Sequence, residues 1–122
     1  MRLCVVALNP AIDAEWRVED VLWEEKNVVH AQRRWPGGKG ANVARWLKFL
    51  SHDPELLIPL GGATGREMSS GLRAQRLCAH IVSLIEDTRV NVIVTTEQHA
   101  PRMRRCLQCR LEFSFQWSGK CG

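Results

Sequence analysis

The stretch Trp35-Pro36-Gly37-Gly38-Lys39-Gly40-Ala41-Asn42 decides how the rest of this 122-residue chain is interpreted. Three glycines in four positions let the backbone turn sharply and approach a ligand closely. Apolar residues recur at helical spacing over residues 41–50, so we expect the glycines to open an amphipathic helix. A helix N-terminus presents free N–H groups and positive potential, which suits an anion or a ring of hydroxyls. The same glycines would also serve as a plain turn that lets the helix pack.

Two side chains of this stretch add binding chemistry. Lys39 brings a mobile cation, and Asn42 brings an amide that both donates and accepts hydrogen bonds. The spacing excludes a Walker loop, because the four-residue spacer and the Lys-Ser/Thr ending are absent. It does not fit the dinucleotide-binding fingerprint either.

Composition favours one globular body followed by a different tail. Residues 1–98 carry twelve Lys/Arg and twelve Asp/Glu, whereas residues 99–122 carry five basic residues and one acidic residue. The net charge of +4 therefore belongs to the tail, which also holds three of the five cysteines. A short basic run is usually a solvated surface, so we expect no nucleic-acid partner.

The first residues lead directly into an apolar strand pattern rather than a signal peptide. No apolar run approaches the roughly 20 residues that span a bilayer. We therefore expect a cytoplasmic protein with reduced cysteines and no membrane partner.

The N-terminal part predicts a buried strand and a lid. Residues 3–8 form a continuous apolar run, which is typical of a buried parallel strand. Such a strand would deliver Asp13 to the carboxyl edge of the sheet, where open α/β folds bind ligands, although a turn or capping role is the alternative. Residues 14–18 and 27–32 alternate apolar and polar side chains, as half-exposed antiparallel strands do. We expect the tryptophans of this part to be packing residues: Trp16, Trp23 and Trp35.

The remaining elements complete an α/β pattern. Residues 56–60 predict a second buried strand, and a helix is expected from about residue 67 to residue 77. Residues 80–85 and 89–95 predict two further strands. Strands and helices alternating in this way indicate an α/β fold.

Taken together, residues 3–98 resemble the N-terminal part of a PfkB-type, ribokinase-like carbohydrate kinase. The branch that they most resemble is the 1-phosphofructokinase and tagatose-6-phosphate kinase group, which acts on phosphorylated hexoses. The matching segments occur in the family's order and spacing: Ala7-Leu8-Asn9-Pro10-Ala11-Ile12-Asp13, Pro36-Gly37-Gly38-Lys39-Gly40-Ala41-Asn42-Val43-Ala44-Arg45, Gly61-Gly62 to Gly65, and Asp87-Thr88-Arg89. The resemblance implies the N-terminal portion of a ribokinase-like α/β sandwich with a small antiparallel β lid.

The resemblance also implies a set of substrate-binding residues. Asp13 would bind sugar hydroxyls, while Lys39 and Arg89 would hold the phosphate that the sugar already carries. Gly37, Gly38 and Asn42 would line the sugar pocket. Lys26 occupies a position where some members of the branch place a lid lysine. No catalytic residue and no metal ligand is assigned in this chain.

The implied activity is ATP-dependent phosphoryl transfer to a hydroxyl of a phosphorylated hexose, with ATP and Mg²⁺, by a protein that would dimerise through its lid. The family's C-terminal half carries the catalytic base, in a Gly-Ala-Gly-Asp-type segment, together with the ATP site. This chain contains no such segment, so we expect a partial kinase domain over residues 1–98 that is inactive alone. Residues 99–122 look like an irregular, basic, Cys-containing tail, as a truncated or frame-disrupted end would be.

An alternative places the function in the tail. Cys106-Leu107-Gln108-Cys109 has the spacing of a zinc knuckle, and His99 with Cys121 would complete four ligands. The second pair lacks knuckle spacing. The chain would then be a non-catalytic interaction or zinc-binding fragment.

Overall fold

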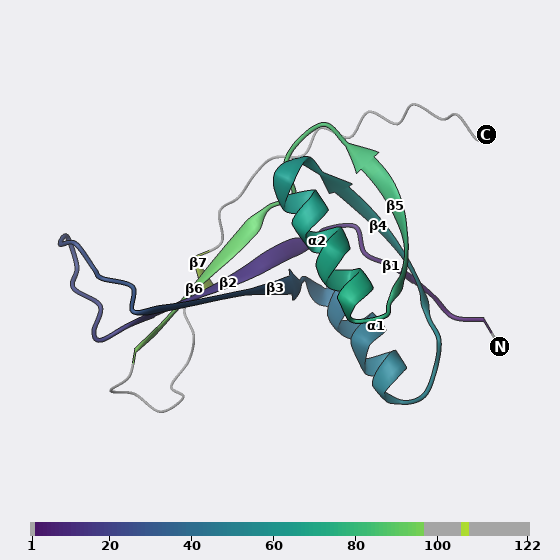
Figure 1. Ribbon diagram of the computed structural model, residues 1–122, viewed down its shortest axis with the longest axis horizontal. Helices are drawn as coiled ribbons and strands as arrows, with labels where there is room; N and C mark the ends of the chain where they lie inside the picture. Colours follow the sequence, from purple (N-terminus) through teal and green to yellow (C-terminus); the bar gives the residue numbers. More distant parts are fainter. Residues whose placement is uncertain (1, 97–105, 108–122) are drawn as a thin grey trace.

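The computed structural model of the chain describes residues 2–96 and 106–107, which form two sheets and two helices (Figure 1). In chain order the elements are β1 (Cys4–Val6), β2 (Ala11–Val18), β3 (Ala31–Gly37), α1 (Lys39–Phe49), β4 (Glu55–Gly61), α2 (Gly62–Ala74), β5 (Cys78–Leu84), β6 (Val90–Thr96) and β7 (Cys106–Leu107).

The first sheet is parallel and three-stranded, in the order β1-β4-β5. Its central strand β4 alternates cleanly: Leu56, Ile58 and Leu60 are buried, whereas Leu57 between them is 38% exposed. The buried side chains pack against Met68 and other buried residues of the two helices. Both helices therefore cover the same face of this sheet. The apolar run of residues 56–60 predicts a strand buried on both faces. Within the described residues, no element covers the face of β4 that carries Leu57.

The second sheet has the order β3-β2-β6-β7 and extends away from the helices as the lid (Figure 1). Strands β2 and β3 form the expected antiparallel pair. Strands β2 and β6 pair in parallel, so the lid is a mixed sheet rather than a purely antiparallel one. The predicted α/β class with a β lid is confirmed, and the parallel pair brings β6 next to the first half of the chain.

Two elements begin four or more residues from where the sequence indicates. Strand β3 spans Ala31–Gly37 instead of 27–32, because Pro36 and Gly37 pair with Ile12 and Ala11 of β2. Proline is tolerated there since β3 is the edge of the lid sheet. Helix α2 begins at Gly62 instead of near residue 67. The N–H of Ala63 in its first turn donates to the carboxylate of Asp87. Local helix signals cannot reveal a contact between residues so far apart in the chain.

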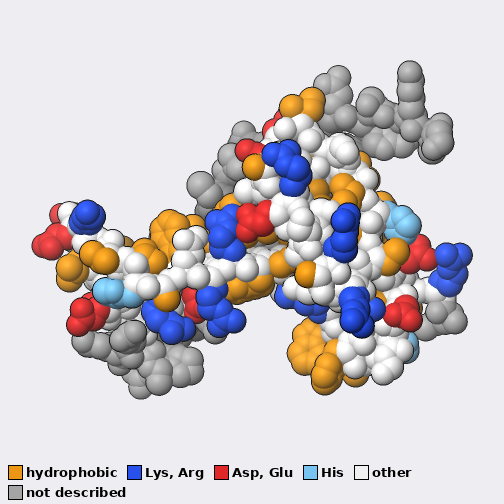
Figure 2. Space-filling view, in the orientation of Figure 1, with side chains coloured by type: hydrophobic (Ala, Val, Ile, Leu, Met, Phe, Trp, Pro, Cys, Tyr) orange, Lys and Arg blue, Asp and Glu red, His pale blue; other side chains and the backbone are white. Residues whose placement is uncertain are grey.

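Exposed apolar side chains mark the lid loop and the outer side of α1. Trp23 is 72% exposed, so the expectation that it is a packing residue is wrong in this structure. On α1, Trp46 and Phe49 are 66% and 78% exposed, and their rings meet edge to face with centroids 5.7 Å apart. Figure 2 shows hydrophobic side chains gathered over α1 and charges of both signs scattered across the same face. Neither helix of the described part is long and apolar enough to cross a membrane.

The predicted tail lies almost entirely outside the described residues. Only Cys106–Leu107 is described, as strand β7 pairing antiparallel with β6. This short strand differs from the irregular tail that the sequence indicates.

Candidate functional site

A cleft of about 580 Å³ lies beside the residues that follow β1, the start of α1 and the inner face of the lid. Five of the six predicted substrate-binding residues line it: Asp13, Gly38, Lys39, Asn42 and Arg89. The sixth, Gly37, lies directly behind Asp13. The structure thus brings together side chains from β2, α1 and the residue preceding β6.

Each glycine of the Gly-Gly-Lys-Gly element occupies a position where a side chain would not fit, for a different reason in each case. Gly38 is the N-cap of α1 and has a φ of 85°, which residues other than glycine rarely adopt. A Cβ on Gly37 would stand 2.2 Å from Oδ2 of Asp13. A Cβ on Gly40 would stand 2.4 Å from the Cβ of Ala7, so this third glycine permits α1 to pack on the chain after β1. The packing interpretation of the motif therefore holds at Gly40, while the ligand-loop interpretation stays a prediction.

The carboxylate of Asp13 belongs to a hydrogen-bonded chain that crosses the cleft. Asn91 Nδ2 donates to Asp13 Oδ1 at 2.9 Å. Arg89 Nη1 donates to Asn91 Oδ1 at 2.6 Å, and Arg89 Nε donates to Asn9 Oδ1 at 2.7 Å. The cation and the carboxylate are therefore linked through an amide, and no ion pair of the described residues joins them directly.

Arg89 is placed by the two residues before it. Asp87 Oδ1 accepts a hydrogen bond of 2.9 Å from the backbone N–H of Ala63, in the first turn of α2. A carboxylate at a helix N-terminus satisfies a free donor and complements the helix dipole. Thr88 is buried, and its Oγ1 accepts a hydrogen bond of 3.1 Å from the N–H of Gly61. These contacts fasten the segment to the start of α2 and fix the backbone from which Arg89 extends.

The amide of Asn42 is oriented by Arg45, one turn further along α1. Arg45 Nη2 donates to Asn42 Oδ1 and, at 3.0 Å, to the carbonyl oxygen of Pro36. In the described residues the NH₂ group of Asn42 has no hydrogen-bond partner, so it is available to a ligand. Lys39 is exposed at the first position of α1, where it adds positive charge to the helix N-terminus.

Sequence reasoning missed three side chains of the site. Asn9 and Arg45 stood in the matching motifs without an assigned role, while Asn91 carried no signal beyond being a polar residue in a strand. Lys26 does not line this cleft; it lines a separate hollow in the connection between β2 and β3. Among the zinc candidates, His99, Cys109 and Cys121 lie outside the described residues, as does the side chain of Cys106. In the part of the chain that is described, no group of His, Cys, Asp and Glu is arranged to hold a metal.

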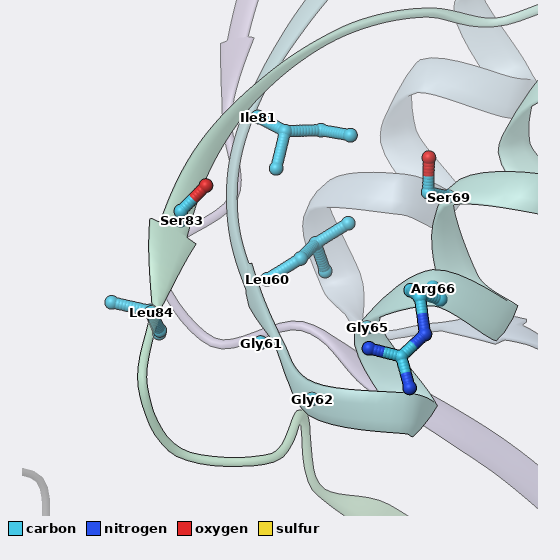
Figure 3. Close-up of a pocket in the computed structure, with 9 residues that line it drawn as sticks. All are labelled: Leu60, Gly61, Gly62, Gly65, Arg66, Ser69, Ile81, Ser83 and Leu84. Atoms are coloured by element: carbon cyan, nitrogen blue, oxygen red, sulfur yellow. The ribbon is translucent and has the colours of Figure 1, made fainter.

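A second, smaller cavity of about 270 Å³ lies between α2 and β5 (Figure 3). Arg66 and Ser69 of α2 and Ser83 of β5 face it, over an apolar floor that includes Leu60 and Ile81. It contains no predicted site residue. The larger cleft is therefore the candidate site.

The fold and this cleft define a ribokinase-like α/β protein. The chain superimposes on phosphofructokinase-2 from Escherichia coli in complex with fructose-6-phosphate with a TM-score of 0.79 and 30% identity, covering 84% of this chain and 34% of that one. The chain belongs to the pfkB family of carbohydrate kinases, whose family model matches residues 2–116. The resemblance inferred from the motifs is confirmed.

Curated relatives agree with this assignment. The 1-phosphofructokinase of Bacillus subtilis is 36% identical over 91 residues, which are 75% of this chain and 30% of that protein. An ATP-dependent 6-phosphofructokinase isozyme 2 of Mycobacterium tuberculosis is 31% identical over 103 residues, which are 84% of this chain and 30% of that protein. The chain thus spans about a third of the length of these relatives.

Proposed function

We propose that this chain forms the sugar-phosphate-binding side of a phosphohexose kinase. The observation that carries the proposal is the meeting of Asp13, Lys39 and Arg89 in one cleft. A carboxylate accepts hydrogen bonds from sugar hydroxyls, and two cations hold a phosphate. The cleft volume of about 580 Å³ lies within the roughly 300–1,000 Å³ of small-molecule pockets.

The individual roles follow from position. Asp13 would bind hydroxyls, with Gly37 behind it. Gly38 would offer backbone at the start of α1, and the NH₂ group of Asn42 would bind a sugar oxygen. Arg89 and Lys39, which line the same cleft, would bind the phosphate. The names of the relatives support a phosphorylated fructose as the ligand.

Kinases of this family use ATP as the phosphoryl donor. The donor set of the cleft does not fit Mg²⁺, because it offers one carboxylate beside two cations, whereas Mg²⁺ needs oxygen ligands without competing positive charge. Phosphoryl transfer requires the donor, the metal, the acceptor hydroxyl and a base in one site. The described residues supply only the acceptor side. We therefore propose that the 122-residue chain binds the sugar phosphate without transferring phosphate by itself.

Calorimetric titration with fructose 1-phosphate, fructose 6-phosphate and tagatose 6-phosphate tests the proposal, with fructose and inorganic phosphate as partial ligands. We expect at least one sugar phosphate to bind more tightly than either partial ligand, and Asp13→Ala and Arg89→Ala each to weaken it. Matched controls are Glu15→Gln, two residues along β2, and Arg73→Ala on α2, which should bind normally. Failure of all three sugar phosphates to bind would refute the proposal.

A coupled ATP-consumption assay with the same sugar phosphates tests the second part. We expect no turnover. Turnover that disappears in Asp13→Ala would show that a complete site assembles from this chain.

We also propose that the lid is the interface of a homodimer. Its loop exposes a group of large apolar side chains, which a soluble monomer rarely presents together: Leu22, Trp23, Val28 and Val29. Light scattering should give a dimer mass that Trp23→Ser shifts toward the monomer, while Trp46→Ser on α1 leaves it unchanged. A monomer at all concentrations would contradict this interface.

A further inference from the structure

Asn91 lies between two of the charged residues of the cleft, Asp13 and Arg89. It is directly opposite Asp13 in the parallel register of β6 and β2. Its amide nitrogen donates to Asp13 Oδ1 at 2.9 Å, and its amide oxygen accepts from Arg89 Nη1 at 2.6 Å. Both ends of one short, half-buried side chain are thus occupied by site residues of opposite charge.

An amide suits this place for a chemical reason. It is neutral and presents a donor at one end and an acceptor at the other, so it satisfies a carboxylate and a guanidinium together. A carboxylate at position 91 would lack the donor and repel Asp13. An apolar side chain would leave both charges free to attract one another, and oppositely charged groups a few ångströms apart in a partly buried site attract strongly.

The remaining atoms of the two charged residues are then available to a ligand. Arg89 Nε donates to Asn9 Oδ1, and Arg89 Nη1 donates to Asn91 Oδ1. For Arg89 Nη2 and Asp13 Oδ2, no hydrogen-bond partner is found among residues 2–96. Within the described residues, one guanidinium nitrogen of Arg89 and one carboxylate oxygen of Asp13 are therefore without a partner.

We propose that Asn91 is a positioning residue that keeps Asp13 and Arg89 apart and holds each toward the cleft. Without it, Arg89 turns toward Asp13 and the two charges neutralise each other. This arrangement, in which the Asn91 side chain hydrogen-bonds both Asp13 and Arg89, is called the clamp below. The clamp rests on the geometry alone. Its consequence for ligands rests on the proposed sugar-phosphate function.

The clamp can be tested without any ligand. In the full ¹⁵N-labelled chain, exchange of the Asn91 side-chain amide protons with water is measured by NMR. We expect the exchange to become about tenfold faster in Asp13→Ala, because a hydrogen bond to a charged acceptor is lost. The side-chain amide of Asn27, which donates to the carbonyl oxygens of Leu22 and Glu25, is the internal control and should not change. Unchanged exchange at Asn91 in a folded Asp13→Ala variant would overturn the proposal.

The consequence is tested by titrating fructose 6-phosphate and inorganic phosphate into Asn91→Leu and Asn91→Asp. We expect Asn91→Leu to bind fructose 6-phosphate about 10- to 100-fold more weakly, the range that losing hydrogen bonds to charged groups implies. Asn91→Asp should lose still more affinity for inorganic phosphate, because the new carboxylate pairs with Arg89. Thr95→Val, a polar-to-apolar change on the same face of β6, should bind as the unaltered chain does.

The two proposals fail in different ways. If the unaltered chain binds fructose 6-phosphate, Arg89→Ala abolishes binding and a folded Asn91→Leu binds normally, then the positioning role is wrong and the sugar-phosphate function stands. If the unaltered chain binds none of the three sugar phosphates, the sugar-phosphate function is wrong, and the exchange of the Asn91 amide decides the clamp. The same exchange measurement decides the clamp if Asn91→Leu does not fold.

Discussion

The carboxylate of Asp13 lies against the backbone of Gly37, so closely that a Cβ on Gly37 would stand 2.2 Å from Oδ2 and 2.6 Å from Oδ1. The two residues are diagonal neighbours in the β2–β3 pairing, in which Asp13 is opposite Trp35 and Ala11 is opposite Gly37. Gly37 therefore contributes space rather than a functional group. The side chain of Asp13 occupies that space and is held there by Asn91.

Gly37→Ala should displace the Asp13 carboxylate. Overpacking of this kind costs about 1–3 kcal/mol of stability, and we expect weaker binding of fructose 6-phosphate as well. The measurement is urea unfolding together with calorimetric titration. In an Asp13→Gly background the same Gly37→Ala change should cost little, because the clashing carboxylate is gone. Additive losses in the double variant would contradict a direct contact.

Asp87→Ala should remove the cap of α2 and loosen the segment that carries Arg89. Loss of a capping side chain costs about 1 kcal/mol, and phosphate affinity should fall with it because Arg89 is less well placed. Urea unfolding and phosphate titration measure the two effects. Asp20→Ala is the control, since among the described residues its carboxylate accepts only from the neighbouring N–H of Val21 in the exposed lid loop. A loss of stability no larger than that of the control would contradict the capping role.

Gly71→Ala should destabilise the chain although alanine favours helices. A Cβ on Gly71 would stand 2.4 Å from Cγ of Pro36, a rigid ring on the neighbouring strand. The steric cost of about 1–3 kcal/mol should exceed the gain in helix propensity of about 1 kcal/mol. Ser70→Ala, at the adjacent exposed position of α2, should be neutral or slightly stabilising. Thermal unfolding of the two variants distinguishes these outcomes, and equal effects would contradict the close approach of α2 to β3.

The ion pair between Arg34 and Glu67 should make a small, pH-dependent contribution. Arg34 Nε and Nη2 each donate to one carboxylate oxygen at 2.8 Å. These hydrogen bonds from Arg34 lower the pKa of Glu67, and the carboxylate raises the pKa of Arg34. Because the pKa of Glu67 is lower in the folded chain, its contribution is complete above the ordinary Glu pKa and is lost as pH falls through the lowered value.

Glu67→Gln should therefore lower the free energy of unfolding at pH 7 by less than about 1 kcal/mol, since the two side chains are 34% and 40% exposed. The difference from the unaltered chain should shrink at pH 3 and in high salt. Asp53→Asn is the control, because Asp53 is 95% exposed and its contact with Lys48 is 3.3 Å long. A difference between Glu67→Gln and the unaltered chain that stayed constant from pH 7 to pH 3 would contradict an ionic origin.

The sequence by itself determined the local elements and the chemistry of the loop. The alternation of apolar residues and the glycines before residues 41–50 predicted most strands and helix α1 to within a few residues, because these signals are local. The motifs carried the family resemblance. The motifs also identified six residues that the structure places in or behind one cleft: Asp13, Gly37, Gly38, Lys39, Asn42 and Arg89.

Only the tertiary structure decided how distant segments hold one another. Helix α2 begins at Gly62 because Asp87, 24 residues after Ala63, caps its first turn. Asp13 is held by Asn91, 78 residues later, because β2 and β6 pair in parallel. Periodicity records which face of an element is apolar, whereas hydrogen bonds between segments far apart in the chain depend on which strands become neighbours and in which register.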